Sequence, residues 1–250
     1  MHTGTRSQRT HTLKERRYLL FREVNLPVEL FHEPVVDLHT RTRASRGWHL
    51  LYTHKKISQC VDKMLLKELK DHYKIIRDEV RCLPNTFISE TPRKEGEWVG
   101  SEHLKEVVSM YASGKHGWLK GGQDHVAEEW ISWPLVWDGQ PVVGNCELCP
   151  KTHALLSSIS GIKVAGFSLM KGGVKLKLHT DDVGPNYKFT YHLGIDVPFG
   201  YCVLHHSKIG DIIEENGKHI ILDAREPHWA ENLSDEDRVI LYMEIHDAFT

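Results

Sequence analysis

Residues 187–197 read Tyr187-Lys-Phe-Thr-Tyr-His-Leu-Gly-Ile-Asp-Val197, and apolar and polar side chains alternate along the whole run. Successive side chains of a β-strand point to opposite faces, so this period predicts a strand with one apolar face and one polar face. His192 belongs to the polar face, which borders either a polar cavity or solvent. A strand of this kind indicates a β-sheet fold for this part of the chain.

Shorter strands are predicted on both sides of this run. They cover residues 162–169, 174–178, 201–204, 219–222 and 239–245, and turn residues separate them. Helices are predicted earlier in the chain, over residues 61–83, 101–111 and 150–156. Helices that precede a set of short strands predict a mainly β fold with flanking helices, a double-stranded β-helix of the jelly-roll or cupin type.

The chain divides into two predicted parts. Residues 1–60 form an N-terminal extension of unclear structure, and residues 61–250 form the β-helix domain with its supporting helices. The first 17 residues are basic, which is typical of a solvated terminus, a transit peptide or an anion-binding arm. No run of about 18 apolar residues and no secretory signal are present. We therefore expect a cytoplasmic protein without a membrane span, with organelle targeting as the alternative.

Charge and cysteine content argue against several classes of protein. A formal net charge of −2 gives no reason to expect binding to nucleic acid. The five cysteines are scattered and odd in number, which fits a reducing compartment. Cys146-Glu-Leu-Cys149 is a lone CxxC, without the second pair that would complete a structural zinc site. The oligomeric state is not indicated by any of these features.

Two histidines and an aspartate have the spacing of a metal site. His179 and Asp181 follow the predicted strand 174–178, and His228 lies about 50 residues later. Two imidazoles and one carboxylate on one side of non-haem Fe(II) leave positions for O2 and a bidentate co-substrate. Because the chain has 18 histidines, chance spacing is a real alternative. In that case His179 is a surface residue and His228 a turn residue.

Two further residues are candidates for binding an anion. Arg238 opens the last predicted strand, where a barrel would point it inward at a carboxylate that matches its planar fork. The alternative is a surface arginine paired with Glu236 or Asp237. Ser168 lies eleven residues before His179, and its hydroxyl could donate a hydrogen bond to the same anion.

Four segments of the chain resemble the aspartyl/asparaginyl β-hydroxylase family. They are Ser168-Leu-Met-Lys-Gly-Gly-Val-Lys-Leu-Lys-Leu-His179, Tyr191-His-Leu-Gly-Ile-Asp-Val-Pro198, Leu222-Asp-Ala-Arg-Glu-Pro-His-Trp-Ala-Glu-Asn232 and Arg238-Val-Ile-Leu-Tyr-Met-Glu-Ile245. The resemblance extends over about residues 61–83 and 130–250 and is strongest in the last ninety. It implies that His179 and His228 bind Fe(II), and that Arg238 pairs with the distal carboxylate of 2-oxoglutarate. Ser168 and His192 would assist Arg238.

The resemblance also implies a reaction. With O2 as second co-substrate, the family converts 2-oxoglutarate to succinate and CO2 and hydroxylates an unactivated C–H bond. The substrate would be the β-carbon of an Asp or Asn in a protein or peptide, although relatives also act on lipid acyl chains and small molecules. Two readings from other classes stay open: a cupin-like binding module without turnover, and a cupin metalloenzyme that does not use 2-oxoglutarate.

Asp181 is a departure from part of the family. Members that act on secreted epidermal-growth-factor-like domains have glycine there and use water in its place, whereas Asp181 offers a carboxylate. Asp181 is either a direct ligand of the iron or, if the loop 180–185 holds it away from the metal, a nearby acid that does not bind it, like Asp182. The missing secretory signal argues against an enzyme of the endoplasmic reticulum. Trp130, Trp133 and Trp137 either line an entrance or pack in the core.

Overall fold

The structure is a computed structural model that describes residues 63–89, 91, 100–120 and 129–247. The predicted N-terminal extension, residues 1–60, lies outside the described residues, so its boundary with the β-helix domain stays a prediction. None of the described helices is long and apolar enough to cross a membrane.

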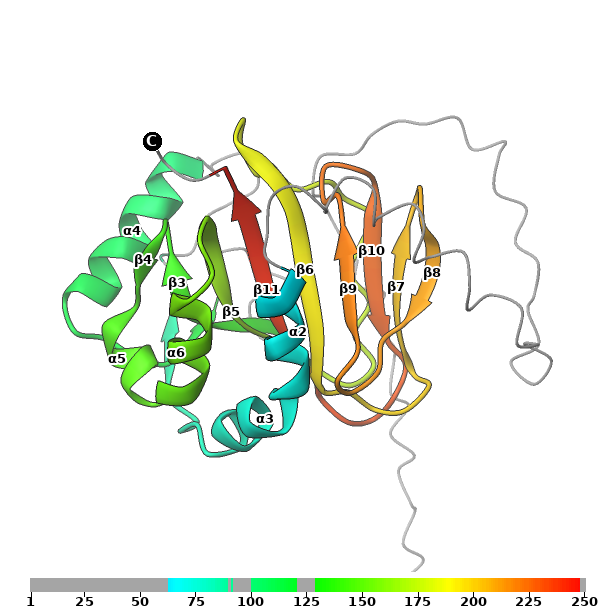
Figure 1. Cartoon of the computed structure of the whole chain (residues 1–250), viewed down its shortest axis with the longest axis horizontal. Coiled ribbons are helices and arrows are strands. Elements are labelled where there is room, and N and C mark those ends of the chain that lie inside the picture. The colour runs from blue at the N-terminus through cyan, green and yellow to red at the C-terminus, as the bar shows by residue number, and fades with distance from the viewer. Residues whose placement is uncertain (1–62, 90, 92–99, 121–128, 248–250) are drawn as a thin grey trace, which may run out of the picture.

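The strands form two sheets (Figure 1). The larger sheet has the order β1-β2-β3-β5-β11-β6-β9, with β4 paired to β3, and the smaller has the order β10-β7-β8. The larger sheet contains β1 (Phe87–Ser89), β2 (Trp118–Lys120), β3 (Trp130–Trp137), β4 (Gln140–Pro141), β5 (Ile162–Met170), β6 (Tyr187–Asp196), β9 (His219–Leu222) and β11 (Arg238–His246). The smaller contains β7 (Cys202–His206), β8 (Gly210–Ile213) and β10 (His228–Asn232). The mainly β, jelly-roll fold predicted from the sequence is confirmed.

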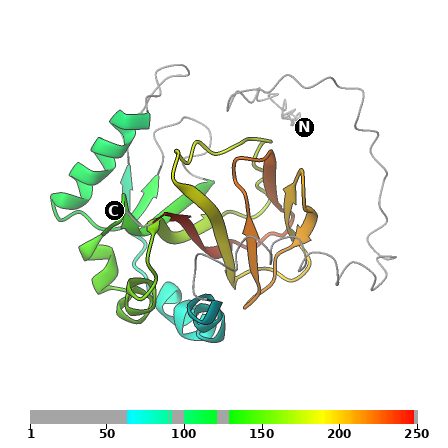
Figure 2. The same cartoon turned by 45° about the horizontal axis from the view of Figure 1, so that its top comes forward.

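The helices pack beside the larger sheet (Figures 1 and 2). They are α2 (Lys63–Asp71), α3 (Tyr73–Arg81), α4 (Gly100–Ala112), α5 (Val143–Glu147) and α6 (Pro150–Ser157). The single helix predicted over 61–83 is wrong, because His72 separates α2 from α3. Glu79 of α3 joins two helices, since its carboxylate accepts hydrogen bonds from the first-turn N–H groups of Lys151 and Thr152, each at 2.8 Å.

The strand predicted over 174–178 is also wrong. This segment is extended, but it forms only isolated bridges to β10, among them Lys175 with Glu231. Other backbone bonds of the segment also run to β10, as from N of Leu176 to O of Ala230 at 2.8 Å. The segment therefore borders the smaller sheet and places His179 opposite His228, the first residue of β10.

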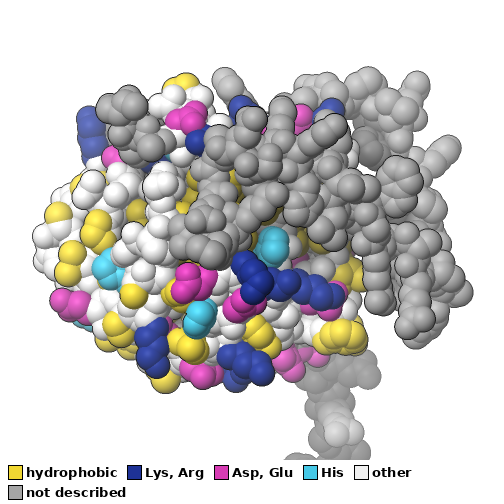
Figure 3. Space-filling view, in the orientation of Figure 1, with side chains coloured by type: hydrophobic (Ala, Val, Ile, Leu, Met, Phe, Trp, Pro, Cys, Tyr) yellow, Lys and Arg dark blue, Asp and Glu magenta, His cyan; other side chains and the backbone are white. Residues whose placement is uncertain are grey.

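Strand β11 separates the hydrophobic core from a cavity. Between its sheet neighbours β5 and β6, its one face contributes Val239, Leu241, Met243 and Ile245 to the helix-covered core. The opposite face lines a cavity, through Arg238, Ile240, Tyr242 and Glu244. This alternation follows from the period of two along a strand. The surface that Figure 3 shows has hydrophobic, basic and acidic side chains interspersed over its described part.

Candidate active site

Two histidines face each other across a backbone bridge. His179 lies in the segment after β5, and His228 is the first residue of β10. The N–H of His179 donates to the carbonyl of His228 at 3.0 Å, and the reverse hydrogen bond is 2.9 Å long. Directly opposed residues of an antiparallel pair have their side chains on one face, and the two ring centroids are 4.4 Å apart. Strand pairing therefore unites two residues that are distant in the sequence.

Both imidazoles are held by nearby backbone carbonyls. Nδ1 of His179 donates to the carbonyl of Lys177 at 2.7 Å, and Nδ1 of His228 donates to that of Glu226 at 2.9 Å. A ring that donates from Nδ1 presents the lone pair of Nε2, the form in which histidine binds metals. Burial holds the pKa of His228 below its usual value, which favours the neutral ring further.

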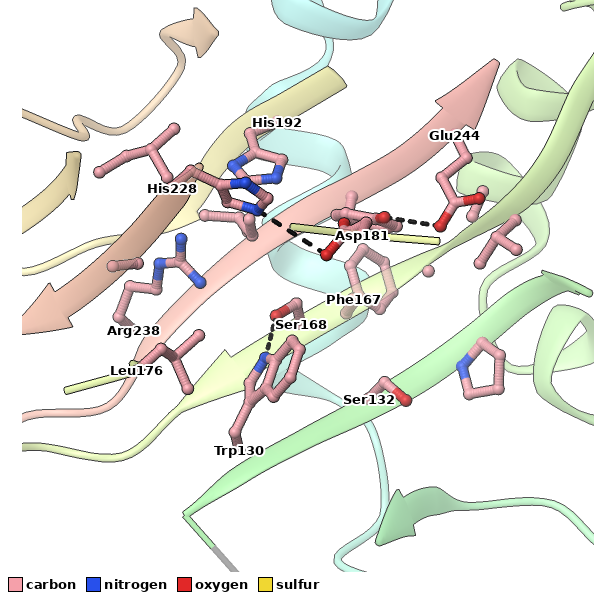
Figure 4. A pocket seen from close by; sticks show the side chains of 18 of the residues that line it. Trp130, Ser132, Phe167, Ser168, Leu176, Asp181, His192, His228, Arg238 and Glu244 are labelled. Atoms are coloured by element: carbon pink, nitrogen blue, oxygen red, sulfur yellow. Dashed lines mark hydrogen bonds and ion pairs between the residues drawn. The ribbon is translucent and has the colours of Figure 1, made fainter. Parts of the chain in front are cut away.

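Asp181 completes a group of three candidate metal ligands. Its backbone N–H donates to the carbonyl of Ala224 at 2.9 Å, which anchors the loop. Its Oδ1 lies 3.5 Å from Nε2 of His179. The same oxygen lies 3.8 Å from Nε2 of His228 (Figure 4). All three donor atoms lie within 4.8 Å of one another, whereas Asp182 is exposed. Two neutral imidazoles and a carboxylate are the donor set of many non-haem Fe(II) sites, so these residues fit that metal.

Arg238 points inward and pairs with an acid that the sequence did not suggest. The side chains of Arg238 and Glu214 are each 3% exposed. Nε of Arg238 donates to Oε2 of Glu214 at 2.7 Å, and Nη2 donates to Oε1 at 2.5 Å. The alternative of a surface pair with the acid at 236 or 237 is wrong, and Asp237 bonds to Lys171 instead, at 2.7 Å.

The Arg238–Glu214 pair brings two compensating charges into the protein interior. Burial by itself opposes ionisation of Glu214, but Arg238 and His192 outweigh it and lower the pKa of the carboxyl to about 2. Glu214 occupies Nε and Nη2 of the guanidinium, and Nη1 has no hydrogen-bond partner among the described residues. Because Arg238 lines the cavity, its remaining N–H groups are available to an anion there.

Glu214 reaches the interior because the turn that follows it lies directly on β6. The N–H of Gly217 donates to the carbonyl of Gly194 at 2.9 Å, and Gly194 also bridges to Asn216. A Cβ atom at Gly194 would lie 2.2 Å from the carbonyl oxygen of Glu215, a distance that no side chain tolerates. Glycine at this position of β6 therefore allows the approach that buries Glu214.

The sequence left two environments open for His192, a polar cavity or solvent, and in the structure the side chain borders the cavity. It is 9% exposed, and its neighbours Tyr191 and Leu193 lie in the core on the other face of β6. Nδ1 lies 3.8 Å from Oε1 of Glu214, too far for a hydrogen bond, and has no partner among the described residues. Burial lowers the pKa of His192, although Glu214 opposes the shift. The ring therefore offers a neutral, unpaired polar atom.

Ser168 is prepared to donate a hydrogen bond. Its hydroxyl oxygen accepts a bond from Nε1 of Trp130 at 2.8 Å, which leaves the hydroxyl proton for another acceptor (Figure 4). Trp130 and Trp137 line the cavity, whereas Trp133 is fully buried in the core. A register shift between Pro134 and Val136 moves Trp137 to the cavity side of β3, so the predicted core environment holds for Trp133 alone.

One cavity collects every predicted site residue. It has a volume of about 320 Å³, and its polar lining includes His179, Asp181, His228, Ser168, His192 and Arg238. Most of its wall is apolar, with Leu176 and Phe167 among the contributors. A predominantly apolar pocket with a few convergent polar groups is the usual form of a small-ligand site.

A family model described as aspartyl/asparaginyl beta-hydroxylase matches residues 70–247. The chain belongs to this family. The matched range begins within α2 and includes all six site residues. The family resemblance found in the sequence is therefore confirmed.

A curated relative of this chain is the ornithine lipid ester-linked acyl 2-hydroxylase of Rhizobium tropici, 31% identical over 117 residues. The match covers 46% of this chain and 41% of the relative, so the chain spans about two fifths of the length of that protein. An oxidoreductase of the 2OG-Fe(II) oxygenase family from Burkholderia pseudomallei is 13% identical, with a TM-score of 0.37, and covers 59% of this chain and 80% of that one. A Cupin_2 domain of a transcriptional regulator from Enterobacter cloacae is 11% identical, with a TM-score of 0.32. The match covers 47% of this chain and 97% of that domain.

The CxxC motif of this chain lies apart from the cavity. Cys146 and Cys149 are buried beside α5 and α6, and both are free thiols. Burial raises the pKa of Cys146 to about 11 and that of Cys149 to about 12. Thiols of this kind carry little thiolate at neutral pH and pack as small apolar residues.

Proposed function

We propose that this member of the family holds Fe(II) with His179, Asp181 and His228 and uses 2-oxoglutarate and O2 to hydroxylate an aliphatic C–H bond. The observation that carries the proposal is that these three donors and the buried Arg238 line the same cavity. Two imidazoles with one carboxylate suit Fe(II), and a buried arginine suits a diacid. In a cupin without a dicarboxylate co-substrate, Arg238 would serve only as the partner of Glu214.

The iron, when bound, activates O2 for oxidation of the substrate, coupled to decarboxylation of 2-oxoglutarate to succinate and CO2. The chain positions the participants. Arg238 binds the distal carboxylate of 2-oxoglutarate through the N–H groups that Glu214 leaves open. Ser168 adds its hydroxyl proton, and Nδ1 of His192 adds a further polar contact. The apolar wall excludes water, which strengthens each of these electrostatic contacts.

The lining of the cavity favours an aliphatic substrate. Apolar groups from β5, β7, β10 and β11 surround the metal-ligand cluster, contributed by Phe167, Leu204, Ala230 and Ile240. The relative from Rhizobium tropici is named for hydroxylation of an acyl chain. An acyl chain or another aliphatic segment is therefore our first candidate, ahead of the β-carbon of an Asp or Asn residue.

The proposal is tested by adding Fe(II) and 2-oxoglutarate to the purified chain without O2. A 2-oxo acid chelated to iron gives a weak visible charge-transfer absorption, and we expect this band to form. Succinate is the matched control, because it has both carboxylates but lacks the 2-oxo group, and it must give no band. If folded protein that binds iron shows no band with 2-oxoglutarate, the chain is a binding module or a metalloenzyme that uses another chemistry.

Asp181 and Asp182 provide an internal comparison for the metal site. We expect Asp181→Gly to weaken Fe(II) binding by roughly 100-fold, because one of three ligands is lost. Asp182→Gly should leave the affinity unchanged, since that side chain is exposed outside the cluster. Anaerobic titration with Fe(II) measures both variants. Equal affinity of Asp181→Gly and the parent chain would show that water, not Asp181, completes the site.

A further inference from the structure

A second carboxyl group lies at the far end of the cavity from Arg238. Arg238 and Glu244 belong to the same face of β11, separated by six residues, so their Cα atoms lie about 20 Å apart along the strand. Tyr242 and Ile240 fill the positions between them on that face. Figure 4 shows Arg238 and Glu244 on opposite sides of Asp181. The cavity therefore extends beyond the metal-ligand cluster to a separate polar end.

Among the described residues, only one of the two carboxyl oxygens of Glu244 accepts a hydrogen bond. The hydroxyl of Tyr242 donates to Oε1 at 2.7 Å (Figure 4). Oε2 accepts no hydrogen bond from any described residue, and its nearest basic atom is Nε2 of His246 at 3.6 Å. On the neighbouring strand β5, Lys163 is already paired with Asp138. One oxygen of a positioned carboxyl is therefore left for a ligand in the cavity.

The surroundings of Glu244 determine which charge such a ligand can carry. The side chain is 17% exposed, and Val164, Ala165 and Pro134 make the wall around it apolar. Burial raises the pKa of Glu244 to about 7; the hydrogen bond from Tyr242 opposes this shift, the charge of Asp181 adds to it, and Lys163 opposes it least. A carboxylate in such a place is stabilised by a cationic hydrogen-bond donor and destabilised by any anion.

We infer that Glu244, positioned by Tyr242, binds an ammonium group of the substrate while an apolar part of the same molecule lies beside His179, Asp181 and His228. This inference rests on the proposed function and narrows its substrate class to aliphatic compounds that carry a primary ammonium group. Arg238 and Glu244 then divide the cavity between two ligands of opposite charge. The diacid co-substrate binds at the Arg238 end, and the cationic substrate binds at the Glu244 end.

The test compares three probes of one chain length on the full chain by titration calorimetry: hexylammonium, hexan-1-ol and hexanoate. A pH of about 8.5 keeps Glu244 ionised and the probe amine protonated. We expect hexylammonium to bind roughly tenfold tighter than hexanol, because a buried charged pair adds to the shared apolar contact, and hexanoate to bind worst. Equal affinities for hexylammonium and hexanol would overturn the inference.

Three variants show whether Glu244 causes the preference for hexylammonium over hexanol. Glu244→Gln, which keeps the shape of the side chain, should reduce the affinity for hexylammonium to that for hexanol and leave hexanol unchanged. Tyr242→Phe should retain part of the preference, since it removes only the bond that orients the carboxylate. Glu236→Gln is the matched control, because Glu236 is exposed outside the cavity, and it should behave like the parent chain. An ammonium preference that survives Glu244→Gln would place the cation elsewhere.

The inference and the proposed function fail in different ways. The charge-transfer band with Fe(II) and 2-oxoglutarate is recorded on the same protein without any probe. A band without an ammonium preference rejects the role of Glu244 and keeps the oxygenase proposal. An ammonium preference without a band rejects the use of 2-oxoglutarate, and keeps Glu244 as the cation-binding residue of a different enzyme or binding protein.

Discussion

Replacement of either histidine of the cluster, His179→Ala or His228→Ala, is expected to abolish stoichiometric Fe(II) binding and with it all turnover of 2-oxoglutarate. Each change removes one of three donor atoms that lie within 4.8 Å of one another. The other two donors keep their places, because hydrogen bonds between backbone atoms of the two segments hold the bridge. Iron content after gel filtration under anaerobic conditions measures the loss.

His116→Ala is the matched control for the histidine variants. His116 is exposed and lies outside the cluster, so its removal tests whether loss of a histidine elsewhere in the chain also affects iron binding. It should retain one iron per chain. Full iron content in both His179→Ala and His228→Ala would remove these residues from the metal site, whatever their distances. The cluster would then be a structural contact between the segment 174–181 and β10.

Arg238→Ala is expected to destabilise the fold as well as to prevent binding of 2-oxoglutarate. The change leaves Glu214 buried without its partner, and loss of one member of a buried ion pair costs about 3–5 kcal/mol of unfolding free energy. Urea denaturation measures this loss. Weak co-substrate binding by Arg238→Ala alone would therefore not distinguish a lost contact from a disturbed site.

The double variant Arg238→Met, Glu214→Leu separates the two effects. Replacement of both charges by apolar side chains of similar volume is expected to restore most of the stability, because neither charge is then left unpaired. Binding of 2-oxoglutarate should stay lost, since no guanidinium remains. Lys171→Ala serves as the control, because its pair with Asp237 is solvent-exposed and worth at most about 1 kcal/mol. A double variant that binds 2-oxoglutarate normally would show that Arg238 does not hold the diacid.

Period-two patterns predicted the site where strands are regular. The alternation of 187–197 placed His192 on one face of β6 and Tyr191 on the core face, and the structure has both there. Arg238 at the start of the closing strand followed from the same kind of pattern. The same rule could have found Glu244, which shares the face of Arg238, but its place within an apolar run suggested only a core strand.

Contacts between distant segments were not predictable in the same way. Glu214 stands in an acidic turn sequence that is typical of the surface, and only the close approach of that turn to Gly194 buries it. The opposite environments of Trp133 and Trp137 depend on a register shift within β3, which no local pattern indicates. Likewise, Val174-Lys-Leu-Lys-Leu178 alternates like a strand, yet the partner offered by β10 allows only isolated bridges.

The buried Arg238–Glu214 pair has a consequence for sequence evolution. Since loss of either charge alone leaves the other unpaired in the interior, the two positions are expected to mutate together among descendants of this chain. The residue at position 194 depends on the same pair, because any side chain there displaces the turn that carries Glu214. An alignment of orthologues should therefore show co-variation of 194, 214 and 238. In lineages that keep the arginine without the acid, every N–H group of the guanidinium should be open to the diacid.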